Sequence, residues 1–187
     1  LVNKLSEQTL NSISVEVCGM LNAGQQRPLI EALTASLLAL TMDSPYELGA
    51  LALLVAALVR SFSLRGGSGA HSVLPHFVEA LALALEGALE SQNRTGASNG
   101  VLLLAALYNF RAVHCAVLFG LVRRLIDALR GGSGAGVGED AEQPPGELEL
   151  EQLIKLLSAV GAQLRADDPA ALGEIVRLAQ STGGAAS

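Results

Sequence analysis

The chain has 187 residues and a formal net charge of -6, and half of its residues are apolar although only 3% are aromatic. Leu, Ala and Val must therefore build the core, and because strands favour aromatic and β-branched residues, this composition excludes a mainly β fold and indicates an all-α one. Six acidic residues between Glu139 and Glu151 account for the whole charge imbalance, so the remainder is close to neutral and has no basic stripe for tight, autonomous nucleic-acid binding.

The chain opens with apolar helical patterns separated by short polar breaks. Residues 1–8 are typical of the last turns of a helix, and the absence of an initiator Met suggests a fragment of a longer protein. The three- and four-residue spacing of apolar side chains then predicts helices over about 12–21 and 28–42.

A start signal for the next helix lies at Ser44, Pro45 and Glu47, which form a capping-box pattern with Pro at the first helical position. This pattern predicts a helix from Pro45 to about Phe62. Its apolar run, residues 48–59, is too short to cross a bilayer, which needs about 20 residues. A buried core helix is the expectation.

The middle of the chain is predicted to hold a helical hairpin over residues 99–126, with a polar break at 108–110. Both halves are apolar on most of their circumference, so neighbours must cover them on at least two sides. Before the hairpin, the sequence predicts a flexible glycine-rich break at 66–69, a helix over about 70–89 and a polar loop over 91–98.

Residues 131–146 are rich in Gly, Pro and acidic residues, and we interpret them as a disordered internal loop of a single domain that spans 1–187. Their glycines could be mistaken for a phosphate-binding loop. That chemistry needs a preceding strand and, in its triphosphate form, a Lys, and this segment follows a helix and lacks the Lys.

Two further helices complete the prediction. The first follows the acidic segment, and the second begins at Pro169 behind the capping residues Asp167 and Asp168 and ends at Gly183. The residues that we expect to face inward are Leu150, Leu153, Ile154, Leu157, Val160, Gly161 and Leu164 in the first helix, and Leu172, Ile175, Val176 and Ala179 in the second. The whole series predicts a HEAT-like solenoid of about four to five antiparallel helical hairpins.

No catalytic constellation is evident, so we predict that the chain is not an enzyme and has no catalytic residue, cofactor or metal. His114 and Cys115 suggest a thiol-imidazole pair, but adjacent residues on a helix point about 100° apart, which favours a buried structural pair. Cys18 and Cys115 are expected to be reduced core residues without a disulfide. Neither Cys nor His residues have metal-ligand spacing.

Three segments resemble, in chain order, the middle domain of translation initiation factor 4G: LVNKLSEQTLNSIS, LLAALYNFRAVHCAVLFGLVRRLI and LIKLLSAVGAQLRADDPAALGEIV. The Leu-Tyr-Asn-Phe element and the Val-Gly-x-x-Leu-Arg-x-Asp-Asp-Pro element look most like the nucleolar MIF4G-domain-containing proteins. The likeness covers residue 1 to about residue 180.

The resemblance implies a crescent of HEAT-like hairpins that acts, without enzymatic activity, as an adaptor for a DEAD-box RNA helicase of the initiation-factor-4A class. It also implies a nucleolar protein of small-ribosomal-subunit biogenesis and rRNA processing. The family's helicase contact matches Asn3 and Lys4, for which a plain solvated helix end is the alternative. The adaptor would bias the helicase toward its closed state on RNA and ATP, and so shift a population rather than supply chemistry.

Two alternatives stay open. Four arginines are candidates for weak direct RNA binding, namely Arg111, Arg123, Arg124 and Arg130. The same fold also serves pre-mRNA splicing and translation initiation, although the Tyr108-Asn109-Phe110 element favours the nucleolar branch. We expect no membrane partner, and a monomer.

Overall fold

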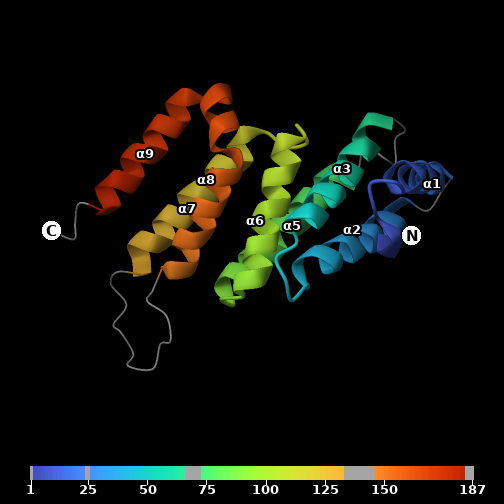
Figure 1. Cartoon of the computed structure of the whole chain (residues 1–187), viewed down its shortest axis with the longest axis horizontal. Helices are drawn as coiled ribbons and strands as arrows, with labels where there is room; N and C mark the ends of the chain where they lie inside the picture. The colour runs from blue at the N-terminus through green and yellow to red at the C-terminus, as the bar shows by residue number, and fades with distance from the viewer. Residues whose placement is uncertain (1, 24–25, 66–72, 133–145, 184–187) are drawn as a thin grey trace. The chain divides into compact units, whose positions relative to one another are not determined.

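The computed structural model describes residues 2–23, 26–65, 73–132 and 146–183. Within these ranges it contains eight α-helices, one 3-10 turn and no strand, which confirms the predicted all-α class (Figure 1). The chain divides into two compact units, residues 1–112 and 113–187, and each is described by itself. The single domain that the sequence suggests therefore stays a prediction.

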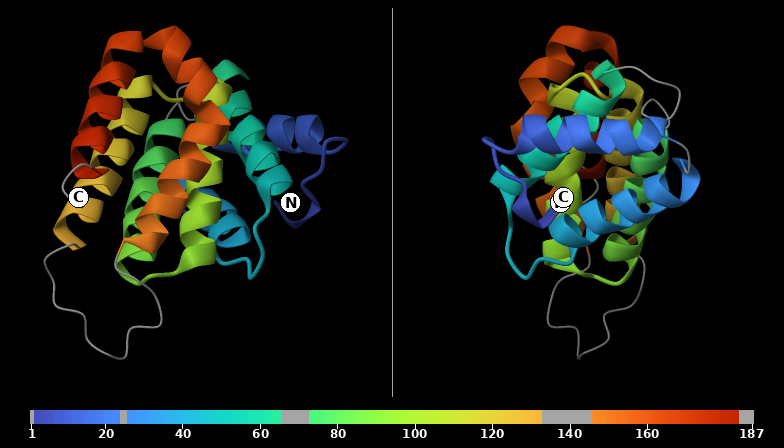
Figure 2. Two further views of the ribbon diagram at one scale, coloured as in Figure 1. Left: turned by 60° about the vertical axis from the view of Figure 1, so that its left-hand side comes forward. Right: turned by 90° about the vertical axis from the view of Figure 1, so that its right-hand side faces the viewer.

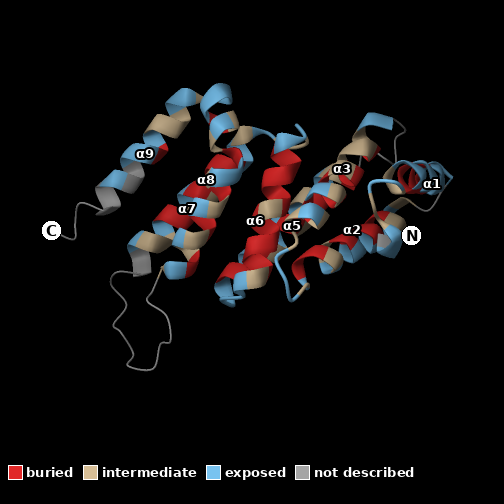
Figure 3. Ribbon diagram, in the orientation of Figure 1, coloured by how far each residue is buried: buried red, intermediate tan, exposed pale blue. Residues whose placement is uncertain are grey.

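The first unit consists of the turn η1 (Val2–Lys4) and the helices α1 (Leu10–Asn22), α2 (Gln26–Met42), α3 (Gly49–Arg65), α5 (Val73–Glu90) and α6 (Arg94–Asn109). Helix α6 is its centre, because it packs against α2, α3 and α5. Figure 3 shows it buried along nearly its whole length. Gly100 lets α2 and α5 approach closely, because an added Cβ atom would come within 3.0 Å of the Met42 and Leu85 side chains.

The second unit consists of α7 (Cys115–Gly132), α8 (Glu147–Asp167) and α9 (Pro169–Gly183), each of which packs against the other two. Apolar side chains buried at spacings of three and four mark the inner faces of α7 and α8, as helical periodicity requires. They are Leu118, Val122, Leu125 and Ile126 in α7, and Leu153, Leu156, Val160 and Leu164 in α8.

The predicted start of α3 is wrong, because the helix begins at Gly49 rather than Pro45. Ser44 accepts a hydrogen bond from the Tyr46 amide at 3.2 Å, so it forms a local turn instead of a helix cap. The backbone before α3 is held instead by Asn99 of α6, whose Oδ1 accepts the N–H of Leu48 at 2.9 Å. A side chain distant in sequence therefore sets this boundary.

The loop predicted over residues 91–98 is also largely helix. Gln92 ends α5 with a left-handed φ of 54°, and the next residue, Asn93, caps α6 by accepting the Gly96 amide on its side chain at 3.0 Å. The two helices predicted over 99–126 are present as the second part of α6 and the first part of α7, but the break between them lies at 110–114.

Three further predictions concern the opening segment, the end of α7 and the start of α9, and they agree with the structure to different degrees. Only residues 2–4 of the opening segment are helical, as a 3-10 turn. Gly131 and Gly132 belong to α7, and most of the predicted disordered loop, residues 133–145, lies outside the described residues. The cap of α9 is confirmed, because Asp168 Oδ1 accepts the Ala171 amide at 2.9 Å.

Part of the predicted inner face of α8 and α9 is exposed. Leu150 is 48% exposed, Ile154 is 58% exposed and Val176 of α9 is 47% exposed. The buried line of α8 instead includes Leu148 and the polar Gln152, which is 0% exposed. The prediction assigned only apolar residues to the inner face. Because the polar Gln152 is buried, the true inner face of α8 is rotated away from the predicted one. Helix α8 thus has apolar residues on two sides.

Candidate partner-binding surface

Asn3 and Lys4, the predicted helicase contact, are both exposed on the turn η1, which packs beside α2 (Figure 2). The Thr9 hydroxyl donates to the Lys4 carbonyl at 2.6 Å and also lies 2.9 Å from the Ser6 hydroxyl. These bonds join η1 to the start of α1. The two side chains are therefore presented to solvent on a turn whose backbone is fixed by the next segment.

A polar network joins α1 to the end of α3. The Ser14 side chain is completely buried, lies 2.6 Å from the Ser61 hydroxyl and accepts Arg65 Nε at 2.8 Å. Arg65 also donates to the Asn11 side chain. Arginine provides several donors in a fixed geometry, so one side chain connects two polar groups of α1 to α3.

The same network affects Cys18, which is buried one turn after Ser14. Burial raises the pKa of the Cys18 thiol, and the positive charge of Arg65 and the hydrogen bond with Ser14 oppose that rise. Cys18 is a free thiol, as is Cys115. Cys115 is half-buried, so only Cys18 occupies the core position that the sequence predicts for both.

The four candidate arginines do not form one helical face. Arg111 is exposed in the loop after α6 and has a left-handed φ of 57°, whereas Arg123, Arg124 and Arg130 belong to α7. Arg123 and Arg130 are exposed and seven residues apart, so they lie on one side of α7, and Arg124 lies on another. Arg123 also forms an ion pair with Glu174 of α9 at 3.7 Å.

His114 and Cys115 are not a buried pair, contrary to the prediction. His114 is exposed and Cys115 is half-buried. His114 Nδ1 accepts the Ala116 amide at 3.2 Å and lies 3.5 Å from the Cys115 sulfur, so the imidazole caps the start of α7. The cap explains why His114 lies close to the Cys115 sulfur. His114 precedes α7, so the 100° angle between successive residues of a helix does not apply to this pair. It accounts for this His without catalysis.

Among the described residues, no group of three His, Cys, Asp or Glu side chains could hold a metal ion. An open cavity of about 320 Å³ lies between α2 and α5 and is lined by Gln26, Arg27, Ile30, Glu31 and His76. Arg27 and Glu31 form an exposed ion pair at 3.0 Å across one turn of α2. This cavity brings together one carboxylate and one imidazole, too few to ligate a metal.

No described helix is both long and apolar enough to cross a membrane. The cavity on α8, lined by Leu150 and Ile154, is a feature that the sequence prediction missed, because both residues were expected to face inward. Its signal in the sequence is a second line of apolar residues beside the buried one.

The MIF4G domain family model matches residues 1–182. Suppressor of glycerol defect protein 1 of Schizosaccharomyces pombe is 28% identical over 94% of the chain and 21% of its own length. Nucleolar MIF4G domain-containing protein 1 of Homo sapiens is 25% identical over 97% of the chain and 19% of its own length.

Suppressor of glycerol defect protein 1 of Saccharomyces cerevisiae is 25% identical over 93% of the chain and 19% of its own length. The chain thus spans about a fifth of the length of the curated relatives it matches. No solved structure matches the chain.

Proposed function

Because the chain belongs to the MIF4G domain family, whose members are generally non-catalytic scaffolds, we propose that it is an adaptor that binds a DEAD-box RNA helicase of the initiation-factor-4A class. Family membership by itself supports a scaffold or adaptor role in RNA-related processes. The finer proposal, a helicase cofactor in small-ribosomal-subunit biogenesis and rRNA processing, is supported by a relative named for the nucleolus.

The observation that carries the proposal is the exposure of Asn3 and Lys4 on one short turn. An amide and an ammonium group side by side offer donors to backbone carbonyls and carboxylates of a protein partner. The turn is fixed by the bond from Thr9 to the Lys4 carbonyl, so little conformational entropy is lost when these groups bind. Such a preorganised polar contact suits the rim of an interface.

The test is a pull-down of a helicase of this class with Asn3→Asp and Lys4→Glu combined. Because a cation and a neutral donor become acids, we expect at least about a tenfold loss of affinity. Arg177→Glu with Gln180→Glu is the control, since it changes the charge by the same amount at exposed positions of α9. Unchanged helicase binding in the Asn3 and Lys4 variant would remove the proposed contact.

A second measurement addresses the mechanism. If the adaptor biases the helicase toward its closed state, it must bind that state more tightly and therefore raise RNA-dependent ATP hydrolysis by the helicase. The Asn3 and Lys4 variant should lose this stimulation, and the α9 control should keep it. Stimulation that persists in the variant would place the effective contact elsewhere.

The family alternative is a scaffold in pre-mRNA splicing or translation initiation. Imaging of the tagged full-length protein distinguishes the branches, because the nucleolar proposal predicts accumulation in the nucleolus. A cytoplasmic or nucleoplasmic distribution would favour the alternative.

A further inference from the structure

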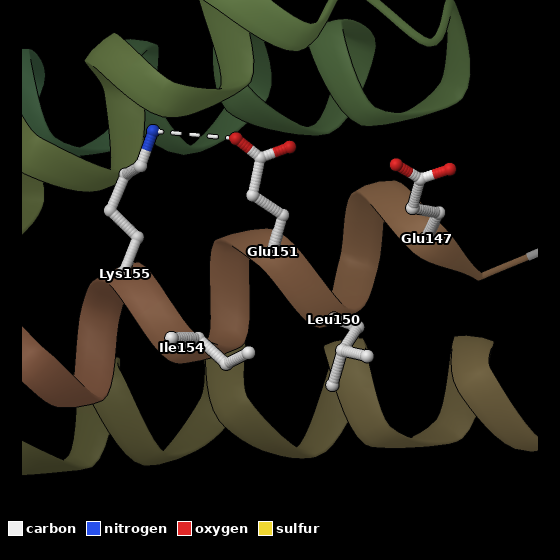
Figure 4. Close-up of a pocket in the computed structure, with 5 residues that line it drawn as sticks. All are labelled: Glu147, Leu150, Glu151, Ile154 and Lys155. Carbon is white, nitrogen blue, oxygen red and sulfur yellow. Dashed lines mark ion pairs between the residues drawn. The ribbon is translucent and has the colours of Figure 1, made fainter.

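Helix α8 carries an apolar line that is only partly buried. Leu150 and Ile154 are 48% and 58% exposed, and half-buried Leu157 and Gly161 continue the line at spacings of four, three and four residues. Figure 4 shows Leu150 and Ile154 along one side of α8, with Glu147, Glu151 and Lys155 along the other. An open cavity of about 360 Å³ lies over these residues.

The spacing of this line is the same when read from either end of the helix. In an antiparallel pair of two α8 helices, Leu150 of one copy lies opposite Gly161 of the other, and Ile154 lies opposite Leu157. A Cβ atom added to Gly161 would meet nothing within 4 Å, so there is open space above this glycine. The large Leu150 side chain of a second copy fits this space.

The charges at the two ends of α8 are complementary in the same orientation. Glu147 begins the helix and Arg165 lies in its last turn, and both are exposed. They are about five helical turns apart and therefore lie on the same side of α8. Between them, Glu151 and Lys155 form an ion pair with each other at 3.6 Å. The flank of the apolar line is thus acidic at its start and basic at its end.

We propose that α8 binds α8 of a second copy of this chain in antiparallel orientation, with Leu150 over Gly161 and Glu147 beside Arg165 in two symmetric contacts. Antiparallel pairing also sets the helix dipoles head to tail. A parallel pair would bring like charges together. A basic helix from another protein would match Glu147 but would meet Arg165 with the same charge. A second copy is therefore the occupant that fits both ends.

One face of one helix is a small interface. It buries much less than the roughly 800 Å² per partner of a stable complex, so we expect a dissociation constant on the order of 100 µM. The chain is then a monomer at low concentration, as the sequence suggests, and a dimer at high concentration. This association does not depend on the proposed helicase contact, which lies on η1 in the other unit.

The association is measured by sedimentation equilibrium of the 187-residue chain from about 10 µM to 1 mM at low salt, a range that brackets the expected constant. Gly161→Leu fills the space that Leu150 of the second copy needs, so it should weaken dimerisation by at least about tenfold. Gly120→Leu on α7 is the matched control, because this exposed helical glycine also has nothing within 4 Å of an added Cβ atom. Circular dichroism verifies that both variants keep their helix content.

A charge exchange tests the orientation. Glu147→Arg and Arg165→Glu should each abolish measurable dimerisation at low salt, because each places like charges together at both symmetric contacts. An equal mixture of the two variants should dimerise again, since every contact then joins an acid to a base. A wild-type chain that stays monomeric at 1 mM, a Gly161→Leu dimer of unchanged affinity, or a mixture that fails to dimerise would each overturn the proposal.

Discussion

Asn99 of α6 completes the backbone hydrogen bonding of Leu48, a residue 51 positions earlier, at the start of α3. Its Oδ1 accepts the Leu48 N–H and its Nδ2 donates to the Tyr46 carbonyl, both at 2.9 Å. Asn99 is only 2% exposed, so water has little access to replace either bond. A single amide thereby fixes the loop between α2 and α3 onto the central helix of the first unit.

Asn99→Ala should lower the free energy of unfolding by about 2 to 3 kcal/mol, because it leaves two polar backbone groups without their partners. Urea unfolding followed by circular dichroism measures the change. Asn22→Ala, at an exposed position in the last turn of α1, is the control and should change stability by less than about 0.5 kcal/mol. Equal effects of the two substitutions would show that the Asn99 bonds contribute little.

The Asn99 contact also explains why the sequence located α3 but not its first residue. Apolar periodicity is local and identifies a helix from its own residues. Ser44, Pro45 and Glu47 match the local capping pattern, yet a hydrogen bond from another helix fixes the backbone at Leu48 and the helix starts later. Patterns along the chain do not contain that information.

Gln92 ends α5 in a left-handed conformation that favours glycine. The Asn93 amide donates to the Ala88 carbonyl at 2.8 Å and the Gln92 amide donates to the Leu89 carbonyl at 3.2 Å, which is the Schellman pattern. Gln92→Gly should therefore raise the free energy of unfolding by about 0.5 to 1 kcal/mol. Gln92→Ala, which keeps the strain and loses the side-chain bond to Leu89, should not stabilise. Thermal unfolding distinguishes the two variants, and a stabilising Ala would contradict the strain argument.

Gly146 precedes α8 with a φ of 90°, and a Cβ atom there would come within 3.0 Å of the Leu129 side chain. Gly146→Ala should lower the free energy of unfolding by about 1 to 2 kcal/mol, since the backbone is strained for any L residue. Gly120→Ala on α7 is the opposite case and should stabilise by about 0.5 to 1 kcal/mol through helix propensity. Chemical denaturation of both variants checks the difference in sign.

The residues of the candidate surfaces were predictable to different degrees. Resemblance to the MIF4G family suggests Asn3 and Lys4 as a partner contact, and both are exposed in the structure. The sequence groups Arg111 with the three arginines of α7, whereas the structure places this residue in the break between α6 and α7. Apolar periodicity does not predict the exposed line of α8, because it assigns every apolar residue of a helix to the core.

The two cysteines should differ in reactivity with an aromatic disulfide reagent. Cys18 is buried and its pKa is raised by that burial, so little thiolate forms near neutral pH, whereas Cys115 is half-buried at the start of α7. We expect the Cys115 thiol to react at least about ten times faster than the Cys18 thiol in the native protein. Cys115→Ala should remove the fast phase. Loss of the fast phase in Cys18→Ala instead would reverse the assignment.

The raised pKa of Cys18 also predicts a pH dependence of stability. The contribution of the neutral Cys18 thiol to the free energy of unfolding is fully present below the unfolded-state pKa of about 8.5. It is lost as pH rises through the higher folded-state pKa, because the unfolded chain ionises first. The free energy of unfolding should therefore fall more steeply above about pH 8.5 in the native sequence than in Cys18→Ala. Urea titrations of both proteins at several pH values between 7 and 10 provide the comparison. Parallel curves would mean that Cys18 ionises alike in both states.

Direct RNA binding through α7 makes a prediction of its own, because Arg123 is engaged by Glu174 at 3.7 Å. Glu174→Gln removes this competing carboxylate and should strengthen RNA binding, whereas Arg123→Glu should weaken it and reduce the dependence of log Kd on log salt by about one unit. Fluorescence anisotropy with a short single-stranded RNA at several salt concentrations measures both effects. Glu31→Gln on α2 is the control, since it removes one exposed acid from an ion pair in the other unit. If Glu174→Gln and Glu31→Gln strengthen binding equally, net charge rather than the α7 arginines governs the RNA affinity, and if titrations are flat even at low salt, these arginines do not bind RNA.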